Sequence, residues 1–297
     1  MARGRQIRDR LARHALLGVA AISVLTLGLI CIFLFMEGLP VFREVSLSGF
    51  LFGRLWYPTA QPPEFGIYPL IMGSLGVTVI SALISIPFGV LTAIYIAEIA
   101  SPRVRELIKP LLELVAALPS VVIGFFGMVV MAPFLQDTFD LATGLNLFHA
   151  ALMLALMSVP TICSLAEDAI YSVPRSLKEA SFALGADHCE TIFRVVLPAS
   201  ISGIATAVIL GMSRTIGETM VVLMVAGGAA MAPDSLFSPV RPMPASIAAE
   251  MAEAPFRGEH YHALFATGIV LFVFTFLFNL AADLIAHRFR QAGEASL

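Results

Sequence analysis

The sequence predicts an all-α, polytopic membrane protein with about six transmembrane helices, and three observations support this fold class. Hydrophobic residues make up 58% of the 297 positions and charged residues only 13%, whereas soluble domains carry about 25% charged residues. The mean hydropathy is +0.89. Long apolar runs recur at residues 15–36, 69–97, 111–135, 147–169, 199–227 and 263–286. Backbone groups in hydrocarbon must bond to one another, so runs of this length are expected to be helices.

The placement of lysine and arginine predicts how these helices are oriented. If the N-terminus is cytoplasmic, 13 of the 18 basic residues fall in cytoplasmic segments, four fall in outer loops, and Arg214 remains within the fifth span. Cytoplasmic loops are the ones enriched in Lys and Arg. Both termini and the loop at residues 174–198 are therefore predicted to be cytoplasmic. The run 15–36 is longer than the apolar region of a signal peptide, so we interpret it as an uncleaved first transmembrane helix.

This pattern divides the chain into four segments. Residues 1–14 form a basic cytoplasmic segment, residues 15–68 the first helix and a long outer loop, residues 69–290 the core, and residues 291–297 a cytoplasmic tail. Within the core, Pro119 is expected to bend the third span, because proline interrupts helical hydrogen bonding.

Two outer loops carry aromatic and acidic residues. In the first, Trp56 and Tyr57 are expected either at the headgroup level of the membrane or on a surface that receives a delivery protein. The second, residues 233–262, is expected to be irregular with one short helix near residues 245–254. It ends in Glu-His-Tyr-His at 259–262. These are possible metal ligands, but a lone cluster in a polar loop is usually solvated, and no metal site is predicted.

The polar loop at residues 174–198 reads locally as two short helices joined by a glycine. Ser176 and Glu179 have the spacing of a capping box, in which the two side chains satisfy free N–H groups at the start of a helix. Gly185 suits the left-handed position just after a helix end. The start signal recurs at Asp187, and the second helix is expected to run to the proline that opens the fifth span. Local physics alone leaves an ordinary cytoplasmic helical hairpin open.

The residue order in this loop resembles the EAA loop of ABC importer permeases. Residues 179–181 read Glu-Ala-Ser, Gly185 follows after three residues, and residues 195–198 read Val-Val-Leu-Pro. Ser181 and Val195 are small departures from the family pattern. The resemblance implies a type I ABC importer permease (MetI-like) fold, in which this loop is the coupling helix that docks on a separate ATP-hydrolysing subunit. The residues that it assigns to this contact are Glu179, Ala180, Ser181, Leu184 and Gly185.

Two charged residues, Arg214 and Glu218, stand inside the fifth span. Their spacing of four predicts that both side chains lie on one helical face. Charges at this depth are costly and normally face a bundle interior or a watery path. One interpretation is a self-neutralising pair that fixes helix packing. The other is an arginine that lines the pathway of an anion, held by the glutamate, since the guanidinium fork matches tetrahedral oxyanions.

The sequence around this pair resembles phosphate-specific ABC permeases. Residues 213–220 read Ser-Arg-Thr-Ile-Gly-Glu-Thr-Met, similar to that family's Arg-Ala-Ile-Gly-Glu-Thr-Met, and residues 118–125 and 65–69 resemble two further motifs. Thr215 and Ile123 depart from the pattern. The long first outer loop favours the C-type subunit (PstC) over its A-type partner. The resemblance implies a phosphate pathway that includes Arg214, Glu218, Thr219 and Ser120.

These resemblances predict the permease subunit of an ATP-driven importer that moves inorganic phosphate across a bacterial inner membrane. The expected partners are a similar A-type permease, a dimer of ATP-binding subunits, a periplasmic phosphate-binding protein and membrane lipid, with no nucleic acid. The chain has no GxxxxGK[ST] sequence, so ATP and Mg²⁺ are expected on the partner, and this chain is expected to bind no cofactor and to be no enzyme. A permease for another oxyanion (sulfate, phosphonate or molybdate) and a passive channel or scaffold remain alternatives.

Overall fold

The computed structural model describes residues 2–294 and confirms the all-α class. Helices cover most of the described chain, and its two strands, β1 (Trp56–Tyr57) and β2 (Glu64–Phe65), form one short antiparallel pair. Among the described residues, six helical segments are long and apolar enough to cross a membrane, which agrees with the predicted number of spans. They are Ala12–Arg43, Tyr68–Ile99, Ser120–Phe139, Leu147–Tyr171, His188–Ile216 and Glu259–Leu284.

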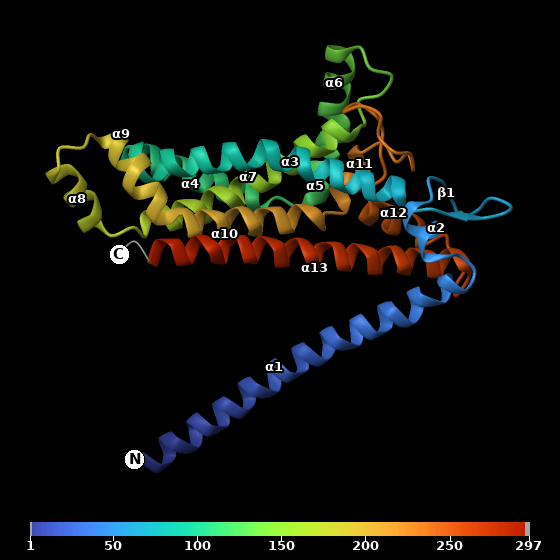
Figure 1. Ribbon diagram of the computed structural model, residues 1–297, viewed down its shortest axis with the longest axis horizontal. Coiled ribbons are helices and arrows are strands. Elements are labelled where there is room, and N and C mark those ends of the chain that lie inside the picture. The colour runs from blue at the N-terminus through green and yellow to red at the C-terminus, as the bar shows by residue number, and fades with distance from the viewer. Residues whose placement is uncertain (1, 295–297) are drawn as a thin grey trace.

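Four long helices form the central bundle and lie side by side in Figure 1: α3 (Tyr68–Ile94), α7 (Leu147–Tyr171), α10 (Leu197–Ile216) and α13 (Glu259–Glu294). The central helix, α7, contacts both α3 and α10, and α13 packs on α10. Ile162 of α7 fits against two glycines, Gly89 of α3 and Gly211 of α10. A Cβ would lie 2.8 Å from the Ile162 side chain at Gly89 and 2.4 Å from it at Gly211. The glycines therefore allow the three helices to approach closely.

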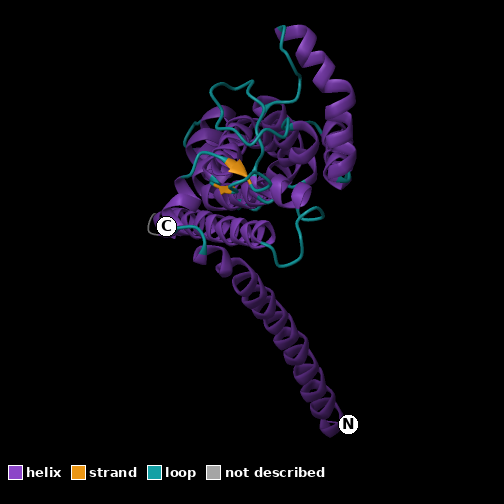
Figure 2. Ribbon diagram, turned by 90° about the vertical axis from the view of Figure 1, so that its right-hand side faces the viewer, coloured by secondary structure: helices purple, strands orange, loops and turns teal. Residues whose placement is uncertain are grey.

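The first helix, α1 (Ala2–Gly38), diverges from the bundle in both views (Figures 1 and 2). It contacts α13 near its C-terminal end, where Phe33 packs edge-on against Phe265 with ring centroids 5.6 Å apart. A Cβ at Gly38 would lie 3.0 Å from the backbone nitrogen of Ala266, so this junction is tight. Most of the described α1 side chains before it are exposed.

The predicted third span, residues 111–135, is wrong at its start. The chain ends one helix before Pro119 and begins another after it, so the proline separates two helices where we expected a bend. Leu118 has extended backbone (ψ 132°), as the residue before a proline prefers. The elements observed here are α4 (Pro102–Ala117), α5 (Ser120–Phe126), the π-helical turn η3 (Gly127–Met131) and α6 (Ala132–Phe139).

The predicted fifth span, residues 199–227, is wrong at both ends. Its helix starts earlier and runs without a break through α9 (His188–Thr191), the π-helical turn η4 (Ile192–Val196) and α10. It ends at Ile216, and residues 217–219, which we call the helix break, separate it from the short helix α11 (Met220–Val225). Gly217 stands at the C-cap of α10.

The remaining elements gather at the two ends of the bundle (Figure 1). One end, the hairpin end, carries η2 (Tyr95–Ile99) and α8 (Arg175–Ala183). The opposite end, the Trp56 end, carries the strand pair with η1 (Leu39–Arg43), α2 (Leu47–Phe52) and α12 (Met243–Glu250). The short helix expected near residues 245–254 is α12, displaced slightly toward the N-terminus. Of the predicted tail 291–297, residues 295–297 lie outside the described residues, as does residue 1 of the predicted segment 1–14.

Candidate functional site

The hairpin, residues 174–198, turns at Gly185 as predicted. Gly185 has φ +86°, and its N–H donates to the carbonyl of Phe182 at 2.9 Å, while the N–H of Ala186 donates to the carbonyl of Ser181 at 3.3 Å. This pair of bonds is the Schellman arrangement that closes a helix when the next residue is left-handed. The predicted capping box at Asp187 and Glu190 is also present and starts α9.

The predicted capping box at Ser176 and Glu179 is wrong. Pro174 occupies the N-cap of α8, and no side chain caps that helix start. Ser176 lies inside the first turn, so its side chain is not in the cap position. The proline explains the shift, because its fixed φ suits the beginning of a helix and removes one N–H that would otherwise lack a partner.

The hairpin presents an apolar tip to its surroundings. Leu184 is 90% exposed and Phe182 is 46% exposed. Of the five residues assigned to the coupling contact, Glu179, Ala180, Leu184 and Gly185 are exposed. The fifth, Ser181, is buried, and its hydroxyl lies 2.9 Å from that of Thr191, which joins α8 to α9. The tip of the folded hairpin thus leaves apolar side-chain surface uncovered in the isolated chain.

Helix α4 is attached to α7 at the same end. Lys109 Nζ lies 2.9 Å from the carboxylate of Glu167, whose side chain is 7% exposed. The hydrogen bond to this carboxylate raises the pKa of Lys109 above its ordinary value, so the lysine carries its charge at all physiological pH values. The buried carboxylate is thereby neutralised.

Arg214 lies in the last turn of α10 and is exposed. Among the described side chains, no carboxylate lies within ion-pair distance of its guanidinium. The depth of Arg214 follows from its neighbour Thr215, whose hydroxyl lies 2.7 Å from that of Ser158 near the midpoint of α7. An unpaired arginine is therefore level with the middle of a candidate span.

The expected pairing of Arg214 with Glu218 is wrong. The two residues are not on one helix, because α10 ends at Ile216 and Glu218 lies in the helix break. The Glu218 carboxylate turns to α11, where Oε1 accepts hydrogen bonds from the N–H groups of Met220 (3.2 Å) and Val221 (3.4 Å). Glu218 therefore caps α11 and leaves the charge of Arg214 uncompensated by it.

The other two residues of the predicted pathway lie on elements that meet near the break. Thr219 is half-buried at the N-cap of α11, and Ser120 is half-buried at the start of α5. These helices pack closely, since a Cβ at Gly124 would lie 3.3 Å from Cα of Val221. The structure thus brings the α5 and α11 segments together.

Sequence reasoning missed Asn279, which stands beside this region on α13. Its Oδ1 accepts a hydrogen bond from the hydroxyl of Ser213, the residue before Arg214. Asn279 is exposed in the isolated chain, so its amide group adds hydrogen-bonding capacity to the face that carries Arg214. A lone amide within the apolar run 263–286 was the available signal, because polar residues in spans are seldom placed against lipid.

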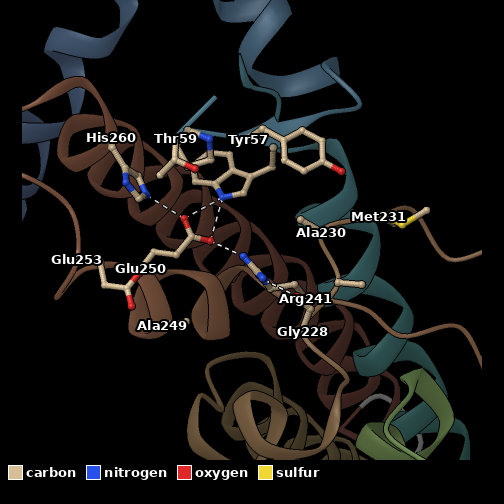
Figure 3. A pocket seen from close by; sticks show the side chains of 13 residues that line it. Tyr57, Thr59, Gly228, Ala230, Met231, Arg241, Ala249, Glu250, Glu253 and His260 are labelled. Atoms are coloured by element: carbon tan, nitrogen blue, oxygen red, sulfur yellow. Dashed lines mark hydrogen bonds and ion pairs between the residues drawn. The ribbon is translucent and has the colours of Figure 1, made fainter. Parts of the chain in front are cut away.

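The Trp56 end contains a largely buried hydrogen-bonded cluster around the single carboxylate of Glu250 (Figure 3). Its carboxylate accepts hydrogen bonds from Trp56 Nε1 at 3.0 and 3.1 Å, from Ser246 Oγ at 3.1 Å and from a nitrogen of Arg241 at 2.5 Å. Arg241 and Ser246 both bond to Oε1 of Glu250, and His260 Nε2 lies 2.8 Å from Oε2. We call these five residues the Glu250 cluster. It joins the first outer loop to α12 and α13, which local sequence patterns did not indicate.

This cluster changes the interpretation of both outer loops. Trp56 is only 2% exposed, so its indole is a buried hydrogen-bond donor that is covered by protein and is not presented to lipid headgroups. His260 is hydrogen-bonded to the Glu250 carboxylate and His262 to the backbone carbonyl of Glu37, so neither ring is simply solvated. Among the described residues, no group of three possible ligands could hold a metal ion. Beside the cluster is an open cavity of about 530 Å³, lined by Tyr57, Thr59, Met231, Glu253 and others (Figure 3).

With this geometry in hand, comparison with known proteins decides the family. The model of the family described as "Binding-protein-dependent transport system inner membrane component" matches residues 85–291. This chain belongs to that family. The permease is 37% identical to the probable ABC transporter permease protein YqgH of Bacillus subtilis, over 96% of this chain and 93% of that protein. It is 36% identical to the phosphate transport system permease protein PstC of Mesorhizobium japonicum, over 89% and 86% of the two chains.

Two solved structures confirm the predicted importer-permease fold. A chain of a bacterial alginate ABC transporter, in complex with a periplasmic protein bound to an alginate pentasaccharide, aligns with a TM-score of 0.68 at 18% identity and covers 95% of both chains. A chain of the MetNI methionine ABC transporter in an inward-facing conformation aligns with a TM-score of 0.56 at 21% identity, covering 73% of this chain and 93% of that one.

The family defines what the permease does at a general level. It is a non-catalytic, multi-pass inner-membrane subunit of a binding-protein-dependent ABC importer, which works with an ATPase and a binding protein outside the membrane. Permeases of this family bind no cofactor, and ATP belongs to the ATPase. A passive channel or scaffold without an ATPase is therefore excluded.

Proposed function

We propose that the permease is the C-type subunit of an importer for inorganic phosphate. Relatives named as phosphate permeases PstC support this cargo, at 36% identity in Mesorhizobium japonicum and 33% in Pasteurella multocida. The observation that carries the proposal is the unpaired, exposed guanidinium of Arg214 at mid-span. A cation would be repelled there, whereas a tetrahedral oxyanion can accept several of its N–H donors at once.

Neighbouring groups favour the same cargo. The Glu218 carboxylate accepts hydrogen bonds from two N–H groups at the start of α11. It therefore stabilises the helix break and forms no salt bridge with Arg214. The amide of Asn279 and the hydroxyls of Ser120 and Thr219 then offer neutral hydrogen bonds along the route. These neutral groups can share the hydrogen bonding of an oxyanion that approaches Arg214 without adding further charge to the route.

The exposed face around Arg214 indicates that a second permease subunit packs there. An isolated charge at mid-membrane costs at least about 2.5–3.5 kcal/mol against lipid, so a protein neighbour must cover this face. We assign that place to an A-type permease, with the phosphate route between the two subunits. The hairpin end, at residues 174–198, then faces the cytoplasm and an ATPase dimer, and both termini share that side. The Trp56 end faces a phosphate-binding protein, with the cavity beside Tyr57 within the receiving surface.

Uptake of labelled phosphate by cells that express the complete importer tests the assignment. We expect Arg214→Ala to abolish uptake while the complex still co-purifies, and Arg214→Lys to restore only part of it, because lysine keeps the charge but lacks the fork. Arg103→Ala, which removes an exposed arginine on α4, serves as the matched control and should transport normally. Normal uptake by Arg214→Ala would remove the pathway assignment. Uptake of labelled sulfate in place of phosphate would assign the importer to another oxyanion.

A further inference from the structure

Glu98 stands at the end of α3 that meets the hairpin and contacts both arms of it. The residue lies in η2, the π-helical turn that continues α3 to Ile99. Its side chain bonds to α8 and its backbone carbonyl bonds to α9. Because the two arms meet at Gly185, one residue of α3 holds the hairpin on both sides of its turn.

The bond to α8 is a shielded ion pair. Lys178 Nζ lies 2.5 Å from Glu98 Oε1, and the two side chains are 22% and 6% exposed. Water screens such a pair much less than it screens a surface pair. Lys178 directly precedes the Glu-Ala-Ser residues 179–181, so the lysine ties the exposed segment of α8 to the end of α3.

The bond to α9 comes from His188. Its Nε2 lies 3.1 Å from the carbonyl oxygen of Glu98 and donates to it. The imidazole ring also stacks on the ring of Phe182, with centroids 6.3 Å apart. The two arms are thus tied to each other as well as to Glu98.

The end of α3 is itself held rigidly. A helix end leaves its last carbonyls without helical partners, and Arg105 fills two of them by donating to the carbonyls of Ile96 (2.6 and 3.0 Å) and Ala97 (2.7 Å). His188 takes the carbonyl of Glu98. A displacement of the hairpin at this junction is therefore passed to α3 and not absorbed by a loose helix end.

At its other end, α3 reaches the elements around the helix break. Ser74 accepts a hydrogen bond from the backbone N–H of Met243 at the start of α12 (2.8 Å). Thr78 lines a small cavity together with Thr215 and Glu218. One helix thus extends from the hairpin to the neighbourhood of Arg214.

We propose that Glu98 is a positioning residue that transmits hairpin movement to α3 and thereby couples ATP hydrolysis to transport. This proposal rests on the proposed role of the hairpin as the ATPase contact. The ion pair between Glu98 and Lys178 makes the hairpin and α3 move as one body. Without it, the ATPase can still bind the exposed tip at Leu184 and still turn over, but less of the movement reaches the pathway.

The test compares transport with hydrolysis in the complete importer reconstituted in liposomes. Glu98→Gln removes the charge and keeps the shape. We expect ATPase co-purification and the rate of ATP hydrolysis to stay within about twofold, while phosphate moved per ATP falls about tenfold, the factor that loss of one charge-assisted hydrogen bond gives. Reversing the pair in the double variant Glu98→Lys, Lys178→Glu should restore much of the ratio. A merely structural role would not change that ratio.

The matched control is Glu190→Gln. It makes the same chemical change in the same hairpin, but at an exposed capping residue that bonds within α9 and not to α3. We expect it to transport and hydrolyse normally. An unchanged phosphate-to-ATP ratio in Glu98→Gln, or a parallel loss of hydrolysis and ATPase binding, would overturn the proposal. Failure of the phosphate assignment would appear in the unmutated importer as absent phosphate uptake, so the two failures are distinguishable.

Discussion

Replacement of Gly185 tests the turn at the tip of the hairpin most directly. Gly185 has φ +86°, and a Cβ built there meets no atom within 4 Å. The cost of Gly185→Ala is therefore one of backbone conformation alone, about 1–2 kcal/mol for an L-residue in the left-handed region. Since each 1.4 kcal/mol is tenfold in an equilibrium constant, the observed turn should lose about 5- to 30-fold in population relative to other turns.

Binding of the purified ATPase subunit to the permease in lipid nanodiscs measures this effect. If the ATPase requires the tip as observed, with Leu184 projecting, Gly185→Ala should weaken binding by up to the same factor, about 5- to 30-fold. Gly185→Asn should weaken it less, because asparagine tolerates the left-handed conformation. Gly18→Ala is the control, since Gly18 also has open space around its Cβ but lies in the helix α1. Equal affinities for wild type and Gly185→Ala, or a larger loss with asparagine than with alanine, would refute the reasoning.

Two further predictions concern buried charges. Lys109→Met leaves the Glu167 carboxylate without its partner and should lower the free energy of unfolding by about 1–3 kcal/mol, seen as a lower melting temperature in detergent. Because the pKa of Lys109 is raised on folding, the stability that its ion pair contributes is complete at pH values below the ordinary lysine pKa and is lost only as the pH rises through the raised pKa. The difference in melting temperature between wild type and Lys109→Met should therefore be constant from about pH 6 to pH 8, and a change within that range would contradict the prediction. Glu250→Ala removes the hydrogen-bond acceptor of Trp56, which is the single tryptophan of the chain. Its fluorescence emission should shift to the red and become quenchable by iodide. An unchanged spectrum would show that the Glu250 cluster does not hold the first outer loop.

Features that depend on a few neighbouring residues were predictable from the sequence. The left-handed turn at Gly185 and the capping box at Asp187 were placed correctly, because both follow from chemistry within five or six residues. The number of spans was also predictable, since hydrocarbon thickness sets a length that composition reveals. The start of α8 was not, because Pro174 competes with Ser176 for the cap and the proline begins the helix earlier.

The arrangement of side chains at the candidate sites depends on contacts that local patterns do not contain. The spacing of Arg214 and Glu218 indicates a shared face only if the helix continues, and it ends between them. Trp56 and Glu250 meet across 194 positions in sequence. Lys178 and Glu98 meet across 80. These two contacts follow from how the first outer loop packs on α12 and how the hairpin packs on the end of α3, which the apolar runs do not specify.

The helix break at residues 217–219 has a consequence for the life of the chain before assembly. Its peptide groups leave the regular helical pattern at a depth where acyl chains offer no hydrogen bonds, and Gly217 is exposed in the isolated chain. A newly inserted copy would expose this break and the neighbouring Arg214 guanidinium to lipid until another subunit covers them. Orphan copies should therefore be short-lived in the membrane, and synthesis of the subunits in matched amounts would protect them from degradation.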